Sequence, residues 1–416
     1  MLRKTAIRRW IALLITSVLC MSLAPFTAAS AKTVAQWLEG YDTGEVWFGE
    51  DFAYDITDTQ AVWELLMKPI TVLDVEEVET VYPLVTPGGK KVNNDKLGGF
   101  ISGASAAVHV LGPDEDGWTL IEGIDYYNRV IRGYVKTSLL KEVTPNDHFG
   151  IVVDKLTQRL YIFVDGALFS SVLVSTGLPN DKQPYNETAA GEYLLISWSG
   201  GFDSEGMYCD MAIRFNNGDK IHQVPGILRA DGTYDYSRYE PLLGQKASHG
   251  CIRVARVANE DGVNMRWIWD HLKRNTKVLV WDDRGREVPY PADDMMLYYN
   301  PTGGQYYHAD EYCSSVKSKF LPLTAFTYAE LDNEPYAKLT PCPFCTNVKR
   351  KDEIDLDNLN RGAITQEEYD ALQAARKNGV PTSTPAAQNA SDPGETVTGA
   401  PASLDDIVIT INTVGN

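Results

Sequence analysis

Residues 247–253, which read ASHGCIR, carry the side chains of this chain best suited to nucleophilic chemistry. Cys251 directly follows the flexible Gly250, with a histidine two positions before it and an arginine two positions after it. A cysteine attacks as its thiolate, which nearby positive charge and backbone N–H groups stabilise. A glycine beside it lets the backbone approach a substrate carbonyl closely. The run therefore predicts an acyl-transfer site with Cys251 as nucleophile.

A second set of chemically capable side chains lies in the last third of the chain. It consists of a His-x4-Cys pair and a distant Cys-x2-Cys pair: His308, Cys313, Cys342 and Cys345. Such a set can complete the tetrahedron that a structural zinc ion prefers, and four protein ligands leave no position open for catalysis. A disulfide among the three cysteines, or a redox pair at the CxxC, is the alternative. The redox interpretation is weaker because no strand-then-helix pattern surrounds the CxxC.

The N-terminus has the pattern of an export signal. Four basic side chains precede the apolar stretch 10–23, and residues 29–31 (ASA) supply small side chains for cleavage. We expect residues 1–31 to be a cleaved signal peptide. An uncleaved anchor is the alternative, although the apolar stretch is short for a bilayer span. The mature protein would then be secreted or act at the cell wall, with no stable membrane span.

The cysteine count and the charge narrow the classes of function. Of six cysteines, five follow the signal segment, and an odd number cannot all be paired. At least one is therefore a free thiol or a ligand. Cys209 could form a disulfide with Cys251, but a buried thiol is the preferred interpretation. The formal net charge of −18, without a basic stripe, argues against nucleic acid as a partner.

Several units are expected in a chain of 416 residues. Residues 32–65 are rich in acidic and aromatic side chains, and we expect them to be a leader segment before the first domain. Residues 66–146 alternate apolar strands with Gly/Pro turns. Their GWTLIEG and GYVKTSLL segments resemble bacterial SH3-type domains, which are small β-barrels. This resemblance implies attachment to the cell wall or to a protein ligand, and a structural spacer is the alternative.

The stretch that must position Cys251 is 148–283, which predicts successive strands and one helix over 257–273. Residues 293–350 predict a small α+β module similar to zinc ribbons, and 351–380 a helical hairpin. Residues 381–416, rich in Pro, Thr, Ala and Ser, predict a disordered linker and tail. The fold class expected is a mainly β multidomain protein.

Residues 148–283 resemble the catalytic domain of the L,D-transpeptidase family. The matching segments are VDKLTQRLYIFVDG, STG, GEY in place of the usual Gly-x-Phe, IHQVPG and LGQKASHGCIRV. The resemblance implies a β-sandwich or barrel with a helix. It also implies a cysteine enzyme that cross-links peptidoglycan stem peptides in the cell wall and needs no cofactor for catalysis.

The resemblance assigns the central roles to two side chains and one loop. Cys251 would attack a stem-peptide carbonyl, expel D-alanine and form a thioester. An amine of a second stem would then attack the thioester and receive its acyl group. His222 would be the general base and then the acid, and an imidazolium next to the sulfur would favour the thiolate. Backbone N–H groups at Gly250 and Cys251 would form an oxyanion hole, contributing roughly 3 kcal/mol or more.

Neighbouring residues would support this chemistry. Ser248 would fix the loop, His249 would shape the oxyanion hole or the environment of the thiol, and Arg253 would hold a substrate carboxylate. Two features depart from the family pattern. An insertion at 227–240 forms either a lid or a plain surface loop, and Gln223 stands where the family often has glycine.

Three functions compete. The first is the transpeptidase, and the second is an L,D-carboxypeptidase in which water replaces the amine. The third is a wall-binding or scaffold protein with a degenerate catalytic domain. The intact set of histidine, serine, glycine, cysteine and arginine argues against the third, whereas nothing in the sequence separates the first two.

Overall fold

The computed structural model describes residues 54–77, 79–93, 99–180, 182–216, 218–313, 315–342, 345 and 348–378. The signal peptide predicted at 1–31, most of the leader and the tail predicted at 381–416 lie outside these residues. The chain divides into two compact units, Met1–Tyr41 and Asp42–Asn416, and every element below belongs to the second. In the described part, no helix has the length and apolarity needed to cross a membrane.

A small β module comes first. Its strands are β1 (Ile70–Leu73), β2 (Thr80–Val81), β3 (Ile101–Ser102), β4 (His109–Glu115), β5 (Trp118–Ile124), β6 (Val130–Lys136) and β7 (Leu140–Val143). They pair as β1–β7, β2–β3 and β4–β5–β6. Alternating apolar side chains of these strands and their connections meet in one core: Leu73, Ile101, Val108, Ile121, Ile131 and Val135. Its assignment as an SH3-like module stays a prediction.

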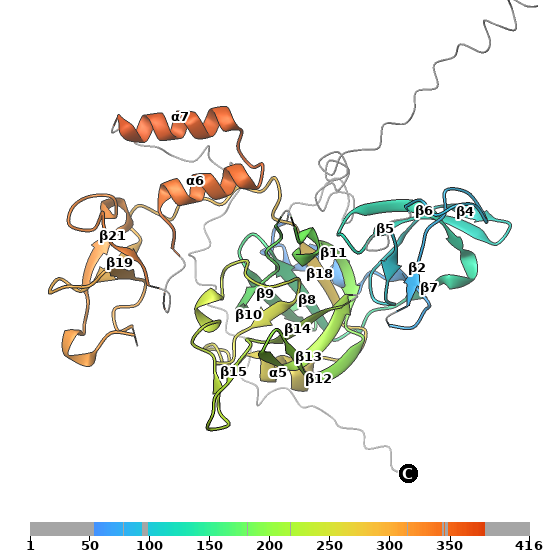
Figure 1. The fold of residues 1–416 in the computed structure, drawn as a ribbon, viewed down its shortest axis with the longest axis horizontal. Helices are drawn as coiled ribbons and strands as arrows, with labels where there is room; N and C mark the ends of the chain where they lie inside the picture. Colours follow the sequence, from blue (N-terminus) through green and yellow to red (C-terminus); the bar gives the residue numbers. More distant parts are fainter. Residues whose placement is uncertain are drawn as a thin grey trace, which may run out of the picture. The chain divides into compact units, whose positions relative to one another are not determined.

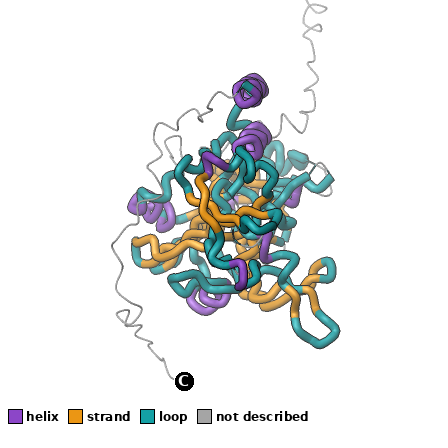
Figure 2. Tube along the Cα trace, turned by 90° about the vertical axis from the view of Figure 1, so that its left-hand side faces the viewer, coloured by secondary structure: helices purple, strands orange, loops and turns teal. Residues whose placement is uncertain are grey.

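The central module is one curled sheet (Figure 1). Its nine strands are β8 (Phe149–Asp154), β9 (Arg159–Val164), β10 (Ala167–Ser175), β11 (Gly191–Leu194), β12 (Ser197–Ser204), β13 (Met207–Asn216), β14 (Asp219–Gln223), β17 (Ile252–Val254) and β18 (Lys277–Trp281). Their order is β11-β18-β8-β9-β10-β17-β14-β13-β12. Most neighbours are antiparallel, but β18–β8 and β14–β17 are parallel. Strands and loops predominate over short helices (Figure 2), so the prediction of a mainly β fold is confirmed.

The helix of this module is shorter than the range 257–273 predicted for it. Helix α5 spans Met265–His271, and the Asn264 side chain caps it by accepting from the Trp267 N–H. Upstream, Oδ1 of Asn259 accepts from the backbone N–H of Asp261 and of Val263. A side chain that bonds to nearby backbone offers the chain an alternative to the helix. The prediction was therefore wrong for the segment before residue 265.

The end of the leader is a packed part of the central module. Helix α4 (Thr59–Met67) buries Val62 and Leu66 in a cluster with side chains of β8, β9 and β18. Lys277 on β18 is fully buried, and its Nζ donates to the carbonyl oxygens of Leu65 (2.7 Å) and Lys68 (2.9 Å). It also forms an ion pair with Glu192 at 2.5 Å. This lysine ties the end of α4 to the sheet.

The small module and the central module share a hydrophobic cluster. The Ala107 N–H donates to the carbonyl oxygen of Glu192 on β11 at 2.8 Å. Side chains from both modules pack together there: Ile70, Val72, Ala107, Leu194 and Ile196.

The C-terminal module consists of strands β19 (Met296–Tyr299), β20 (Tyr306–His308), β21 (Thr324–Thr327) and β22 (Thr340–Pro341), in the order β21-β19-β20-β22. Helices α6 (Lys351–Asn360) and α7 (Gln366–Lys377) follow and contact each other. The Asn358 side chain exchanges two hydrogen bonds with the Val288 backbone, so α6 is fixed to the segment after β18.

Candidate active site and metal cluster

Strands β14 and β17 bring the two key side chains to one face of the sheet. In this parallel pair, Ile221 lies opposite Ile252 and His222 lies opposite Arg253. Opposed residues of a parallel pair point to the same face, and successive residues alternate. Because the two isoleucines are fully buried in the core, four side chains share the other face: Lys220, His222, Cys251 and Arg253.

The His222 ring is buried in its neutral form. Nδ1 lies 2.6 Å from the carbonyl oxygen of Gln223. This oxygen can only accept, so Nδ1 carries the hydrogen and donates it, and the lone pair is left on Nε2. Phe202 packs edge-on against the ring at 5.5 Å. Burial lowers the pKa of His222 to about 4, because desolvation disfavours the charged imidazolium.

Cys251 is a neutral thiol in the resting protein. It is part-buried, and burial together with the negative charge of Asp219 raises the pKa of Cys251 to about 12. The expected imidazolium–thiolate pair therefore does not match these pKa directions, since burial disfavours both charges. Such a pair can still react, because a neutral imidazole can take the thiol proton as sulfur attacks.

The loop before Cys251 is fixed by backbone hydrogen bonds. The N–H groups of Ala247 and Ser248 both donate to the carbonyl oxygen of Thr176, at 2.9 and 3.0 Å. The Ser248 hydroxyl donates to the carbonyl oxygen of Cys251 and accepts from the Gly250 N–H at 3.3 Å. The serine thus holds the turn that presents the thiol.

Gly250 occupies a backbone position that other residues rarely adopt. Its φ is +113°, and its carbonyl oxygen accepts from the Thr188 hydroxyl at 2.7 Å. A Cβ at Gly250 would lie 2.4 Å from Oδ1 of Asp219. Only glycine fits here without strain or displacement.

Arg253 and His249 are placed differently. Arg253 is buried, donates from Nη1 to the carbonyl oxygen of Ala247 at 2.9 Å, and stacks on the Tyr239 ring at 5.3 Å. His249 is exposed, and its Nδ1 lies 3.7 Å from the carboxylate of Glu205. Part of the Arg253 guanidinium is therefore already committed to the loop. His249 lines a polar cavity together with Asp219 and residues of the small module.

Two residues of β14 were missed by the sequence analysis. Lys220 places Nζ 4.0 Å from the centre of the Phe202 ring, and its charge lowers the pKa of Cys251, as does its backbone hydrogen bond. Asp219 touches Gly250, and burial raises its pKa to about 8 although the charge of Arg214 lowers it. Residues two apart in a strand point to the same face, so the position of His222 could have placed Lys220 beside it.

Cys209 also faces this group of side chains. It is buried, and burial raises its pKa to about 11 against the opposing charges of Arg253 and Lys220. All five cysteines in the described part of the chain are free. The structure thus contains neither a Cys209–Cys251 disulfide nor one in the C-terminal module.

The insertion at 227–240 contacts the strands that carry His222 and Arg253. It forms the hairpin β15 (Ile227–Leu228) and β16 (Tyr234–Asp235) and a turn of 3-10 helix, Glu240–Leu242. The side chain of Gln223, next to His222, donates to the Tyr236 hydroxyl at 3.4 Å. Through this bond and the Tyr239 stack, the insertion is attached to the strands of His222 and Arg253.

The C-terminal cysteines and the histidine come together as the spacing predicted. The ligand atoms of His308, Cys313, Cys342 and Cys345 all lie within 4.8 Å of one another. The Cys313 and Cys342 sulfurs are 3.9 Å apart, and Sγ of Cys345 is 3.4 Å from Nδ1 of His308. With Zn–S bonds of about 2.3 Å and Zn–N bonds of about 2.0 Å, a tetrahedral zinc ion separates its ligands by roughly 3.5–3.8 Å. The donor set and its spacing therefore fit zinc.

A second cluster of acids already has its counter-charges. Glu187, Asp282 and Asp283 lie close together, but Nζ of the buried Lys155 is 2.6, 2.8 and 3.7 Å from their carboxylates. Lys246 adds a contact of 2.7 Å to Asp283. Lysine ammonium groups thus occupy the place a metal would take.

Together, the fold and the site define a curled β-sheet domain that presents a cysteine and a histidine on one face. Residues 148–280 match the family model described as YkuD, the L,D-transpeptidase catalytic domain. The resemblance of this region to L,D-transpeptidase catalytic domains is thereby confirmed. No curated protein matches the chain.

Solved structures of L,D-transpeptidases are similar at low identity. One from Stackebrandtia nassauensis is 21% identical, with 33% of this chain and 57% of that chain covered and a TM-score of 0.24. One from Mycobacterium smegmatis is 14% identical, covering 52% and 92%, with a TM-score of 0.26. One from Mycobacterium tuberculosis H37Rv is 16% identical, covering 55% and 86%, also with a TM-score of 0.26.

Proposed function

We propose that this protein is an exported peptidoglycan L,D-transpeptidase that uses Cys251 as nucleophile. The observation that carries the proposal is the β14–β17 register, which sets His222 and Cys251 on one face of a domain that matches the family model. The proposed substrate is the peptide stem of peptidoglycan, and the proposed place of action is the cell wall. The predicted signal peptide at 1–31 and the small β module support export and attachment.

The proposed reaction has two halves. Nε2 of His222 takes the proton of the Cys251 thiol while sulfur attacks the donor carbonyl. The Cys251 N–H stabilises the oxyanion, joined by the Gly250 N–H once it turns from the Ser248 hydroxyl to the substrate oxygen. The carbon–nitrogen bond to D-alanine then breaks, and the amine leaves with the proton from His222. In the second half an acceptor amine attacks the thioester, its proton returns through His222, and the thiol is restored. Arg253 would hold a substrate carboxylate with the guanidinium donors that the loop does not use.

An L,D-carboxypeptidase is the second candidate, because water could replace the amine in the second half. The test is to incubate the mature protein and a Cys251→Ala variant with tetrapeptide-stem muropeptides and to identify the products by mass. Cross-linked dimers made by the wild type alone support the transpeptidase, and trimmed tripeptides alone support the carboxypeptidase. Equal behaviour of the two proteins would support a non-catalytic scaffold and refute the proposal.

We propose further that the C-terminal module holds one structural zinc ion through His308, Cys313, Cys342 and Cys345. The near-tetrahedral spacing of four largely buried ligand atoms supports this. A closed set of four protein ligands stabilises a fold and takes no part in catalysis.

A further inference from the structure

Two positively charged side chains beside the reacting pair, Lys220 and Arg253, have no acidic partner. Among the residues that the structure describes, neither forms an ion pair or a hydrogen bond with a carboxylate. Arg253 is only 5% exposed; it donates to the Ala247 carbonyl oxygen and stacks on Tyr239. Lys220 is half-buried and lies over the Phe202 ring. Because a charge removed from water is stabilised by an opposite charge, both side chains are suited to an anionic ligand.

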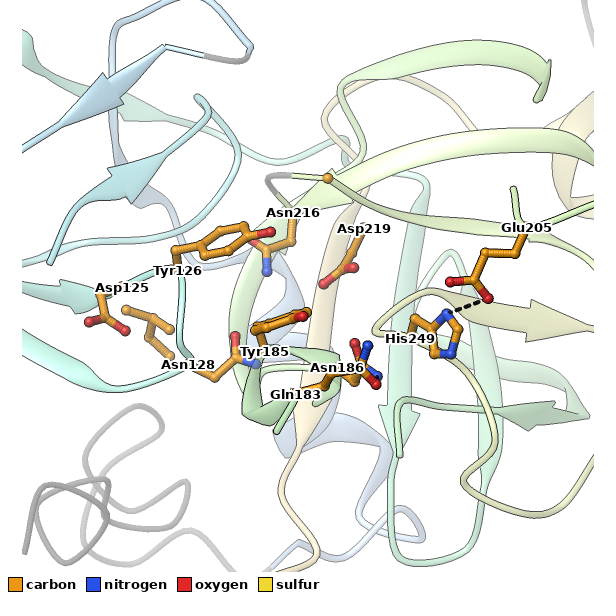
Figure 3. A pocket seen from close by; sticks show the side chains of 12 residues that line it. Asp125, Tyr126, Asn128, Gln183, Tyr185, Asn186, Glu205, Asn216, Asp219 and His249 are labelled. Carbon is orange, nitrogen blue, oxygen red and sulfur yellow. Dashed lines mark hydrogen bonds and ion pairs between the residues drawn. The ribbon is translucent and has the colours of Figure 1, made fainter. Parts of the chain in front are cut away.

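The titratable groups around them do not supply that opposite charge. Burial raises the pKa of Asp219 to about 8, so its carboxyl is mostly protonated at neutral pH. Burial also raises the pKa of Cys251 to about 12 and keeps the thiol neutral. Glu205, whose charge reaches Arg253, is exposed and lies 3.7 Å from His249 (Figure 3). The two cations therefore flank a reacting pair that carries no charge of its own.

The register of β14 and β17 puts these cations on opposite sides of the reacting pair. His222 lies opposite Arg253, and the same register two residues earlier sets Lys220 opposite Cys251. A backbone hydrogen bond from Lys220 to Cys251 agrees with this placement. Residues two apart in a strand are separated by about 6.5 Å and neighbouring strands by about 4.8 Å, so the four positions form a small rectangle. His222 and Cys251 occupy one diagonal, and the two cations occupy the other.

A peptide bound for the proposed reaction would meet one cation on each side of its scissile bond. On the leaving side, D-alanine carries its own carboxylate, the group proposed above for Arg253. On the acyl side the main chain consists of amides, so a carboxylate there must branch from the main chain. Lys220, opposite the attacking sulfur, is closest to the residue that provides the scissile carbonyl. A lysine ammonium binds a carboxylate as a compact charge with several donors.

We propose that Lys220 binds a carboxylate on the side chain of the donor residue whose carbonyl forms the thioester. This rests on the proposed transpeptidase function and names its class of donor: a stem whose third residue has an acidic side chain. The ring of Phe202, 4.0 Å from Nζ, holds the ammonium on the side of the thiol. The two cations then divide the work, since the carboxylate at Arg253 departs with D-alanine and the one at Lys220 stays with the acyl-enzyme.

The test is the discrimination between two donors, measured on the full mature enzyme as kcat/KM for release of D-alanine. Both are tetrapeptide stems with diaminopimelic acid as third residue; one has its side-chain carboxylate free and the other has it as the carboxamide. We expect the wild type to prefer the free carboxylate about tenfold or more. Lys220→Met should abolish this preference, mainly by raising the KM for the carboxylate donor, and Lys220→Arg should keep most of it. Lys273→Met, at an exposed lysine after α5, is the matched control and should keep the wild-type preference.

Thermal melting is recorded for every variant, so that a folding defect is recognised. If Lys220→Met is unfolded, Lys220→Gln takes its place. A wild type that treats both donors alike overturns the assignment of Lys220, and so does an equal loss on both donors in Lys220→Met. Absence of D-alanine release from either donor by the wild type overturns the proposed function, and the assignment of Lys220 with it.

Discussion

The Asp219 carboxylate and the Gly250 backbone are in contact: Oδ1 would be 2.4 Å from a Cβ on Gly250, whose φ is +113°. The contact joins the strand of His222 to the loop of Cys251 at the point where an oxyanion would be bound. The position of that loop therefore depends on the absence of a side chain at residue 250.

Gly250→Ala should abolish turnover while leaving the protein folded. The added methyl group must displace Asp219 or the loop, and the alanine must adopt a strained φ, which costs about 1–3 kcal/mol. We expect the rate of thioester formation to fall at least 100-fold and the melting temperature to fall by several degrees. Gly206→Ala, at a positive-φ turn with open space around it, separates backbone strain from the steric effect. Equal losses of activity in both variants would contradict the account.

The Asp219 carboxyl should make stability depend on pH. Its pKa is raised from 3.8 to about 8, so the folded protein binds this proton more tightly than the unfolded chain does. Its contribution to stability is complete below about pH 4 and is lost as the pH rises toward 8. Asp219→Asn should therefore gain in melting temperature relative to the wild type between pH 4.5 and pH 8. A difference between variant and wild type that is the same at both pH values would show that the group is not perturbed.

Removing the proposed zinc ion should destabilise the C-terminal module. Metal analysis of the purified protein should give one zinc per chain, and a strong chelator should lower the melting temperature. Cys342→Ser should lose the metal, because it removes one of four ligands. Cys209→Ser, at a buried cysteine in the central module, should keep it. Metal-free protein with oxidised cysteines would disprove the site.

Substitution of Lys277 should lower the free energy of unfolding more than most single substitutions do. Lys277→Met leaves the Glu192 carboxylate without its 2.5 Å partner and two carbonyl oxygens of the α4 end without a donor. Losing one partner of a buried pair costs about 3–5 kcal/mol of unfolding free energy. Lys141→Met, at an exposed ion pair with Asp74, should cost less than about 1 kcal/mol. Denaturant titration at pH 7 compares the two, and a similar cost for both would contradict the assigned role of Lys277.

The sequence was most informative where the chemistry is local. The ASHGCIR run and the cysteine spacing each name their residues without reference to distant parts of the chain. The four candidate metal ligands meet as predicted. The His-x4-Cys and Cys-x2-Cys spacings are those of metal-binding pairs, so residue type and local spacing were enough to name them. The pairing of β14 with β17 is not local, so the sequence supplied His222 and Cys251 but not their common face.

The charges of the site could not be read from residue types. The family resemblance implied an imidazolium at His222 beside a thiolate at Cys251, whereas burial keeps both side chains neutral. Burial depends on how the sheet curls and on Phe202, which lies on another strand. The cavity at Asp219 was missed for the same reason, since one of its walls comes from a separate module.

The central claim is that Cys251 carries the acyl group, and intact-protein mass spectrometry tests it most directly. After mixing with a tetrapeptide stem, the wild type should gain the mass of one tripeptide acyl group, and the adduct should map to the peptide containing Cys251. Cys251→Ala should gain nothing, and His222→Gln should form the adduct about 100-fold or more slowly. An adduct of equal yield on Cys251→Ala, or none on the wild type, would contradict the claim.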